Sequence, residues 1–180
     1  MNVEETGLAG CVILRPNVIR DDRGAFVKTV NSDLYAELGL ESGFVEEYYT
    51  VSNRGVLRGL HFQVPPMDHV KLVYCVEGRV LDAVLDIRLG SPTYGKHLMC
   101  ELDAETANIL YIPRGFAHGF YALTDNAKMV YKVSSVYSRD HDQGILWNSA
   151  GIPWPTTEVR TSLRDRGFPS FPEFVSPFHY

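Results

Sequence analysis

The chain has 180 residues, 45% hydrophobic and 22% charged, which predicts one soluble globular domain spanning residues 1–180 and excludes disordered and fibrous classes. Its 22 acidic residues outnumber its 17 lysines and arginines, and the formal charge of −5 excludes a general nucleic-acid binder. A small anionic ligand remains compatible with this charge, provided that a few basic side chains converge locally.

The sequence indicates a cytoplasmic protein with no membrane partner. No apolar run approaches the roughly 20 residues that a membrane helix needs, and the acidic start MNVEETGLAG has no apolar core of a secretion signal. The cysteines Cys11, Cys75 and Cys100 are odd in number and form no CxxC. We therefore expect reduced thiols, as is usual in the cytosol.

Short apolar or alternating runs, broken by Gly, Pro, Asn and Asp, follow one another along the chain. Residues 11–16 and 24–31 are expected to be strands joined by the turn-rich segment 17–24. Residues 32–40 predict a short helix that is capped by Ser32 and ends at Gly39. Eight further strands are expected at residues 44–52, 56–63, 70–78, 79–90, 94–103, 108–113, 117–124 and 127–138. This number and spacing of strands is typical of a β-sandwich or small barrel.

Two other segments bear on the architecture. Residues 80–88 alternate with period two, so that Leu81, Ala83, Leu85 and Ile87 share one face and Asp82, Asp86 and Arg88 share the other with Val80 and Val84. One face of this strand is therefore more polar than the other. The last forty residues are rich in Pro and aromatic residues, and we expect them to pack over the barrel as loops and short helical turns.

The segment IPRGFAHGF (residues 112–120) contains P-x-G-x-x-H, the second motif of cupin barrels, and GLHFQ (residues 59–63) stands where their first motif would be. Most cupins bind a metal through His-x-His, a Glu and the later His. Here Gln63 occupies the second position of the His-x-His pattern, and His61 with His118 does not supply the three or four ligands that a transition metal needs. We expect no metal and no other cofactor, although His69 would be the residue to recruit for one.

His61, Lys71, His118 and Tyr131 come from strands that face each other in such a barrel. Taken singly, a histidine there is more often structural, a lysine more often a surface residue and a tyrosine more often a packing residue. Together they favour a site, because a neutral imidazole near its pKa is a suitable general base once a carboxylate orients it.

Several segments carry a resemblance that covers nearly the whole chain: DDRGAF, SNRGVLRGLHFQVPP, IPRGFAHGF, VYKVSSVYS and GILWN. With these segments the chain resembles the dTDP-4-dehydrorhamnose 3,5-epimerases of deoxysugar biosynthesis, a process that includes O-antigen-type polysaccharides. The resemblance implies an all-β, cupin-like jelly-roll barrel with a short N-terminal helix and a C-terminal loop and helix segment. It also implies a metal-free homodimeric isomerase that acts on nucleoside-diphosphate 4-keto-6-deoxyhexoses.

By this resemblance, four residues carry the chemistry. The C3 and C5 protons flank the C4 ketone, so removing one gives an enolate, and returning it to the opposite face inverts the centre. His61 matches the base, and Asp165 in SLRD matches its orienting carboxylate. Tyr131 matches the acid, and Lys71 matches the cation that stabilises the enolate oxygen. Whether C3, C5 or both are inverted is left open by these residues.

The resemblance also implies binding residues. Arg23, Arg58 and His118 match residues that hold the diphosphate, a role that suits the planar fork of arginine. Phe26 is expected near the nucleotide, and Gln63 is expected to line the substrate site.

The chain departs from the family pattern at the expected base-binding positions. Glu46, Glu47 and Tyr48 stand where Gln-Asp-Asn is typical, and Lys28 stands where a glutamate is usual. An ionised glutamate only accepts hydrogen bonds, whereas an amide also donates. The nucleotide usual in the family is dTDP. CDP and GDP remain open as well, because cytosine and guanine carry an amino group that could donate to Glu46 and that thymine lacks.

Three other functions remain open. The first is a 3,4-ketoisomerase or dehydratase of the same sugars, against which a positioned acid at Tyr131 argues. The second is a metal-dependent cupin enzyme such as a dioxygenase. The third is a non-catalytic sugar-nucleotide-binding cupin, which would need neither His61 nor Tyr131.

Overall fold

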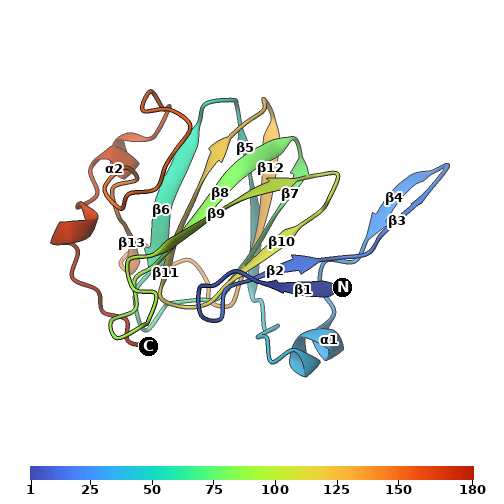
Figure 1. The fold of residues 1–180 in the computed structure, drawn as a ribbon, viewed down its shortest axis with the longest axis horizontal. Coiled ribbons are helices and arrows are strands. Elements are labelled where there is room, and N and C mark those ends of the chain that lie inside the picture. Colours follow the sequence, from blue (N-terminus) through green and yellow to red (C-terminus); the bar gives the residue numbers. More distant parts are fainter.

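Two antiparallel sheets pack face to face (Figure 1) in the computed structural model, which describes residues 1–180. The six-stranded sheet has the order β1 (Asn2–Glu5), β2 (Val12–Arg15), β10 (Ile109–Ile112), β7 (Lys71–Glu77), β12 (Ala127–Val133), β5 (Glu46–Ser52). The five-stranded sheet has the order β13 (Asp142–Gly144), β6 (Leu57–Gln63), β11 (Phe116–Ala122), β8 (Arg79–Asp86), β9 (His97–Asp103). All eight strands expected from residue 44 onward are present. The fold is the all-β, cupin-like jelly roll that the sequence predicts.

The alternation of β8 divides its side chains between two hydrophobic clusters. Val80 and Val84 belong to the cluster between the sheets, whereas Ala83 and Leu85 belong to a second cluster on the outer side of the five-stranded sheet. The more polar face of β8 is therefore the inner one. Its carboxylate Asp82 is fully buried there, which is unusual for a charged group and marks the barrel interior as partly polar.

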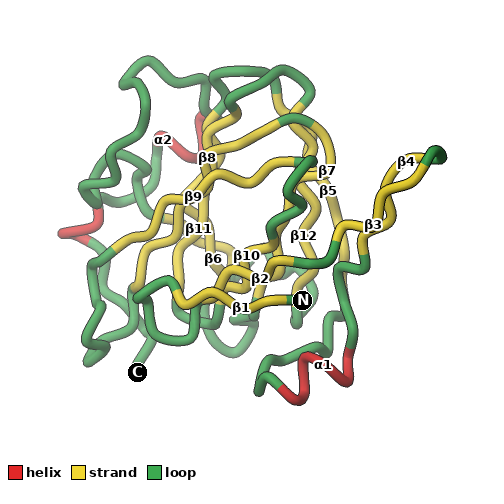
Figure 2. The backbone as a smooth tube through the Cα atoms, turned by 45° about the vertical axis from the view of Figure 1, so that its right-hand side comes forward, coloured by secondary structure: helices red, strands yellow, loops and turns green.

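The C-terminal segment covers the outer face of the five-stranded sheet, as expected. It contains the short helix α2 (Leu163–Arg166) and the 3-10 turn η1 (Phe171–Glu173), and both lie at the opposite side of the molecule from the N-terminal hairpin (Figures 1 and 2). Phe62 of β6 contacts Phe174 and Phe178 edge to face. None of the helices is both long and apolar enough to cross a lipid bilayer.

The N-terminal region corrects one expectation. The segment 17–24 is not only a turn, because its first half is the strand β3 (Val18–Asp21), which pairs with β4 (Gly24–Val27). This hairpin projects from the barrel (Figures 1 and 2). The cross-strand partners Ile19 and Phe26 are 61% and 60% exposed, and no residue of either strand is buried, so the hairpin adds no residue to the core. The strands β1 and β13 were also not expected from the sequence.

The helix α1 (Ser32–Glu37) covers the outer face of the six-stranded sheet through the buried ring of Tyr35. The expected cap Ser32 is wrong, since Asn31 is the N-cap and its side-chain oxygen accepts from the N–H groups of Asp33 and Leu34. Ser32 is instead the first helical residue. Asn and Ser are both favoured at N-caps, so the sequence alone does not determine which of these neighbours is the cap.

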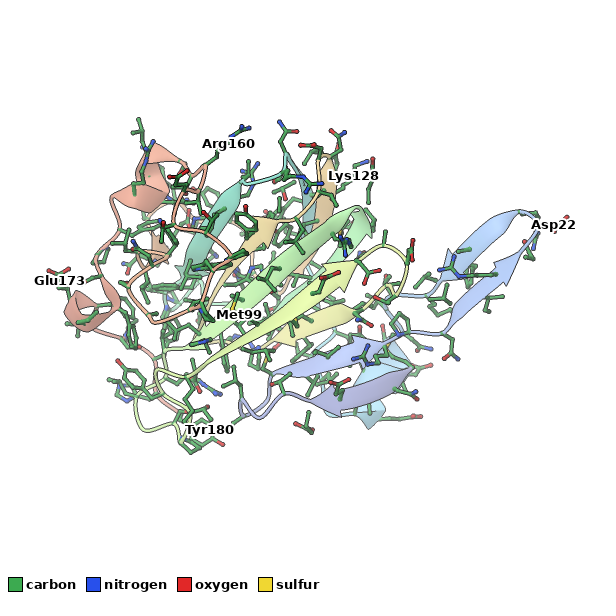
Figure 3. The ribbon with its side chains drawn as sticks, turned by 45° about the horizontal axis from the view of Figure 1, so that its top comes forward. Asp22, Met99, Lys128, Arg160, Glu173 and Tyr180 are labelled. Atoms are coloured by element: carbon green, nitrogen blue, oxygen red, sulfur yellow. The ribbon has the colours of Figure 1, made fainter.

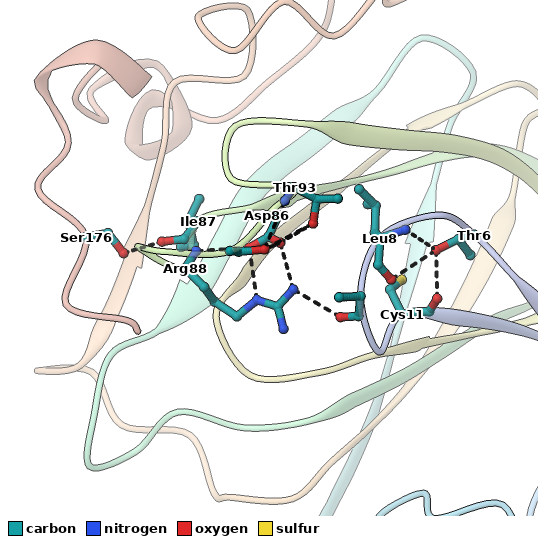
Figure 4. A network of polar contacts seen from close by, with 10 residues as sticks. Thr6, Leu8, Cys11, Asp86, Ile87, Arg88, Thr93 and Ser176 are labelled. Atoms are coloured by element: carbon teal, nitrogen blue, oxygen red, sulfur yellow. Dashed lines mark hydrogen bonds and ion pairs between the residues drawn. The ribbon is translucent and has the colours of Figure 1, made fainter. Parts of the chain in front are cut away.

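A buried polar network fixes the end of β8 (Figure 4). Asp86 is fully buried, and its carboxylate accepts from Arg88 Nη2 at 2.7 Å, Ser91 Oγ at 2.6 Å and Thr93 Oγ1 at 2.6 Å. Burial alone would raise the pKa of Asp86, but these donors hold it below its usual value. The Arg88 guanidinium also donates to the carbonyl of Ala9, at 3.0 Å, so the network connects the N-terminal loop to the barrel.

Replacing Asp86 by alanine is expected to lower the free energy of unfolding by about 3–5 kcal/mol, because the change leaves a nearly buried arginine without its counter-ion. Urea unfolding measures this loss. Asp22→Ala, at the exposed hairpin tip (Figure 3), is the matched control and is expected to stay within about 0.5 kcal/mol of the unmodified protein. Equal stability of the two variants would show that the network contributes no net stability.

Candidate active site

A cavity of about 340 Å³ opens between the two sheets, near the β5 edge of one and the β6 and β13 edge of the other. Five of the predicted site residues line it: Glu46, Tyr48, His61, Gln63 and Lys71. Six residues that the sequence reasoning did not assign also line it: Phe62, His69, Val133, Tyr137, Asp142 and Arg164. Of the predicted catalytic residues, His61 and Lys71 line this cavity directly.

Strand register explains which side chains face this cavity. Tyr131 lies opposite Tyr48, and Val133 lies opposite both Glu46 and Lys71. Directly opposite residues share a face of a sheet, so these side chains point inward from the six-stranded sheet.

The opposite wall is built in the same way. His61 lies opposite His118 on β11, and His118 in turn lies opposite Val84, which belongs to the cluster between the sheets. His61 therefore points inward from the five-stranded sheet. The predicted base and the predicted acid, Tyr131, come from facing walls.

His61 forms a dyad with Asp165. Its Nε2 lies 2.9 Å from Asp165 Oδ1, while Asp165 Oδ2 accepts the N–H of Gly59 at 3.1 Å. Burial alone would raise the pKa of Asp165, but the bonds from His61 and Gly59 hold it below its usual value. With Asp165 accepting from Nε2–H, the other ring nitrogen of His61 has a free lone pair, as a general base requires.

Lys71 brings a cation into the cavity wall. The side chain is buried, and its Nζ donates to the backbone carbonyl of His61 at 3.1 Å, which joins the two sheets. Burial lowers the pKa of Lys71 to about 8, and the nearby carboxylates of Asp142 and Asp82 oppose this shift. The ammonium is therefore charged at neutral pH, but it loses its proton at a lower pH than an exposed lysine does.

Tyr131 is a buried phenol beside the cavity. Its ring stacks on that of Tyr48, with centroids 4.8 Å apart, and it meets His118 edge to face at 6.0 Å. Burial raises the pKa of Tyr131 well above its usual value. The hydroxyl therefore keeps its proton at neutral pH and is suited to donate it rather than to remove one.

His118 lies deeper than expected for a residue that binds diphosphate. It is 3% exposed, and its Nε2 contacts both oxygens of the fully buried Asp82, at 3.0 and 2.8 Å. Burial raises the pKa of Asp82, and the contact with His118 opposes this shift. The structure thus places His118 behind Tyr131 and not on the cavity surface.

A second groove adjoins the cavity at His61. Arg58, Arg160, Arg164 and Arg166 line it, together with Asp165. Arg58 is held in place by bonds from Nε to Ser52 Oγ at 3.0 Å and from Nη2 to the carbonyl of Val51 at 3.2 Å. Four guanidinium groups at one groove make it locally basic in a chain with a formal charge of −5.

Two other predicted residues support loops that border the cavity. Gln63 donates to the carbonyl of Met67 at 2.8 Å and accepts the N–H of Ser138 at 2.6 Å. Glu46 Oε2 accepts the N–H of Tyr137 at 2.7 Å, whereas its second oxygen has no protein partner. Glu47, its neighbour, pairs with Lys132.

The structure does not bring Arg23, Phe26 and Lys28 to the cavity of their own chain. All three are exposed and belong to the projecting hairpin or the residue after it. Figure 3 shows Asp22 at the hairpin tip, on the far side of the barrel from Arg160 in the arginine groove. These residues can therefore contact a ligand only away from the cavity and the arginine groove of their own chain.

A polar pair in the cavity lining was not predicted from the sequence. Asp142 Oδ2 lies 2.6 Å from Arg164 Nη2, and the Arg164 guanidinium lies 5.1 Å from the ring of Phe168. Phe168 in turn meets His61 edge to face at 5.6 Å. Asp142 comes two residues before GILWN, and Arg164 lies within SLRD. Both segments carried the resemblance, so proximity to them was the signal that could have found this pair.

His69 is a further residue without an assigned role. Burial, with the charges of Lys71 and Arg114, lowers its pKa to about 3, so its imidazole is neutral. No group of three or more His, Cys, Asp or Glu side chains is arranged to hold a metal ion.

Comparison with known proteins identifies the family. The family described as dTDP-4-dehydrorhamnose 3,5-epimerase matches residues 5–173. The chain belongs to this family. The dTDP-4-dehydrorhamnose 3,5-epimerase of Shigella flexneri is 43% identical over 92% of this chain and 93% of its own.

Solved structures are similar over the same extent. The Bacillus anthracis dTDP-4-dehydrorhamnose 3,5-epimerase, solved with TDP and PPi bound, has a TM-score of 0.91 at 38% identity and covers 94% of this chain and 98% of its own. The Legionella pneumophila epimerase in complex with dTDP-4-keto-L-rhamnose has a TM-score of 0.94 at 34% identity, covering 99% and 98%. The protein is accordingly an epimerase, an enzyme of the isomerase class.

Proposed function

We propose that this epimerase inverts C3 and C5 of dTDP-4-keto-6-deoxyglucose, through an enolate and without a metal. The observation that carries the proposal is the placement of His61 and Tyr131 on facing sheets. His61 and Lys71 line one cavity, and Tyr131 lies beside it, stacked on the cavity-lining Tyr48 in the same sheet as Lys71. Inversion needs a base on one face of the sugar ring and an acid on the other. A nucleotide-linked deoxyhexose is an activated donor, so we place the reaction in deoxysugar biosynthesis of the O-antigen type.

The first step is removal of a proton beside the C4 ketone. The free ring nitrogen of His61 takes the proton from C3 or C5, the C–H electron pair forms the carbon–carbon double bond, and the carbonyl oxygen becomes an enolate. Asp165 stabilises the imidazolium that forms. The Lys71 ammonium stabilises the enolate oxygen in a partly dehydrated cavity, where a fixed charge is more effective than in water.

The second step returns a proton to the opposite face. The enolate collapses to the ketone, its carbon takes the proton of the Tyr131 hydroxyl, and a phenolate remains. His61 then loses its proton to solvent and Tyr131 regains one, so the net reaction is an isomerisation. Because burial raises the pKa of Tyr131, its phenolate readily regains a proton at neutral pH.

We place the substrate diphosphate in the arginine groove. The groove adjoins His61, and Arg58 already has its guanidinium oriented by two bonds to Ser52 and Val51. Planar guanidinium groups match phosphate oxygens in a bidentate manner. His118 would then contact Tyr131 and not the phosphates.

We assign Arg23, Phe26 and Lys28 to the site of a second copy in a homodimer. The hairpin projects away from its own barrel and leaves apolar side chains in solvent, and a partner chain would cover them. This arrangement reconciles the expected nucleotide-binding role of these residues with their distance from their own cavity.

Glu46 favours a second candidate for the nucleotide. Its free carboxylate oxygen is an acceptor at the cavity, and cytosine and guanine carry an amino donor that thymine lacks.

The test is conversion of the dTDP, CDP and GDP esters of 4-keto-6-deoxyglucose, followed by chromatography and mass spectrometry of the reduced products. Turnover of the dTDP ester at the highest kcat/KM supports the proposal. Preference for CDP or GDP would replace the nucleotide, and no turnover of any ester would overturn the function.

Lys71 gives the activity a pH limit. A lysine is charged below its pKa, so stabilisation of the enolate is present below pH 8 and lost above it. We expect kcat/KM to fall about tenfold per pH unit above this value.

The variants Lys71→Gln and Lys128→Gln test this limit. Lys71→Gln is expected to lower kcat/KM by about 10²- to 10³-fold and to remove the alkaline limb. Lys128, a partly exposed residue paired with Glu77 and outside the cavity lining, is the matched control and should retain the limb. An alkaline limb that persists in Lys71→Gln would assign it to another group.

A further inference from the structure

Tyr48 and Tyr131 form an aromatic pair at the cavity. They are direct cross-strand partners on β5 and β12, their ring centroids are 4.8 Å apart, and their planes differ by 11°. Aromatic pairs of this kind add about 0.5–1.5 kcal/mol beyond the burial of their surface. The ring of Tyr48 therefore has a defined partner, which is the proposed proton donor.

The two rings differ in exposure. Tyr48 is 40% exposed and lines the cavity, whereas Tyr131 is 6% exposed. Tyr131 also meets the ring of His118 edge to face, and His118 is itself fixed by two contacts with Asp82. Tyr131 thus has a buried, hydrogen-bonded histidine on one side and the Tyr48 ring as its aromatic neighbour toward the cavity.

We propose that Tyr48 is a positioning residue for Tyr131: its ring holds the Tyr131 ring against His118 and limits the access of bulk water to it. The inference rests on the proposed function, since it takes Tyr131 as the acid. An asparagine is typical of the family pattern at this position, and an amide offers no ring to stack. The arrangement gives Tyr48 a role other than contact with the base.

The stack acts on one of two competing fates of the enolate. The enolate either regains a proton from the His61 side, which exchanges the hydrogen without inversion, or takes the proton of Tyr131, which inverts the centre. A Tyr131 ring that is free to rotate delivers its proton less often, because small errors in placement cost large factors in rate. Removal of protons by His61 is unaffected, since it uses the opposite wall.

The test compares Tyr48→Ala and Tyr48→Phe in D2O with dTDP-4-keto-6-deoxyglucose, and proton NMR follows exchange and inversion separately. Tyr48→Ala is expected to lower the ratio of inversion to exchange by about tenfold or more. Tyr48→Phe, which keeps the ring, is expected to keep the ratio. Tyr48→Leu keeps the bulk without an aromatic ring and provides the same test if alanine disturbs β5.

Three results would overturn the inference. An unchanged ratio in both the alanine and the leucine variants would mean that Tyr131 needs no stack. Equal losses in Tyr48→Ala and Tyr48→Phe would assign the effect to the hydroxyl. A rise in KM with no change in the ratio would make Tyr48 a ligand contact only. An unmodified enzyme that neither exchanges nor inverts would instead overturn the proposed function, so the two failures are distinguishable.

Discussion

His61→Asn is expected to lower kcat by about 10²- to 10⁴-fold, the range that a general base contributes. Asparagine keeps a polar side chain opposite Asp165 but has no nitrogen that can take a proton at neutral pH. Exchange at C3 and C5 should fall together with inversion, because both follow proton removal. Single-turnover assays and NMR in D2O measure the two rates.

Nucleotide binding separates this effect from misfolding. His61→Asn should bind dTDP with a Kd within about threefold of the unmodified enzyme, since the charged groups of the arginine groove are untouched. His97→Asn, on β9 and away from the cavity, is the matched control and should keep its activity. An active His61→Asn enzyme would remove His61 as the base.

Tyr131→Phe is expected to lower inversion by about 10²- to 10⁴-fold while exchange with solvent continues. Phenylalanine keeps the ring between Tyr48 and His118 but has no proton to donate. The enolate therefore forms and can only be reprotonated from the His61 side. Deuterium would enter the substrate without a change in its stereochemistry, which the coupling constants of the ring protons report.

The neighbouring residue Tyr49 supplies a control for this variant. It is 66% exposed on the outer side of β5, and Tyr49→Phe should retain both exchange and inversion. Inversion at the unmodified rate in Tyr131→Phe would show that another group is the acid. Loss of exchange as well would show that Tyr131 takes part in proton removal.

The strands were predictable because most of them pack one or both faces on a core. In β12 the buried residues Ala127, Met129, Tyr131 and Val133 alternate with the less buried Lys128, Val130 and Lys132, and this period is visible in the sequence. The hairpin β3–β4 has no such pattern, since none of its residues is buried. Its first strand therefore could not be distinguished from a polar turn.

The catalytic set was predicted from motifs, but its arrangement was not. The sequence resemblance named His61 and Asp165, which lie 104 residues apart and meet at 2.9 Å. Asp142 and Arg164 are brought together by the loops that follow β12, and no local pattern records such a contact. The stack of Tyr48 on Tyr131 depends on strand register, which a single sequence does not specify before the partner strand is known.

The binding residues were likewise predicted from motifs, whereas their arrangement was not. A motif placed Arg23, Phe26 and Lys28 with the nucleotide, but only the fold shows that they project from their own barrel. The arginine groove also could not be predicted, because Arg58 and Arg160 come from distant segments that are joined by a backbone bridge at Val56.

The most direct test of the central claim is proton NMR of dTDP-4-keto-6-deoxyglucose with the unmodified enzyme in D2O. Enolate chemistry between His61 and Tyr131 predicts loss of the C3 and C5 proton signals, a mass increase from incorporated deuterium and the couplings of the inverted sugar. Retention of both signals at full intensity, with the protein folded and the nucleotide bound, would contradict it.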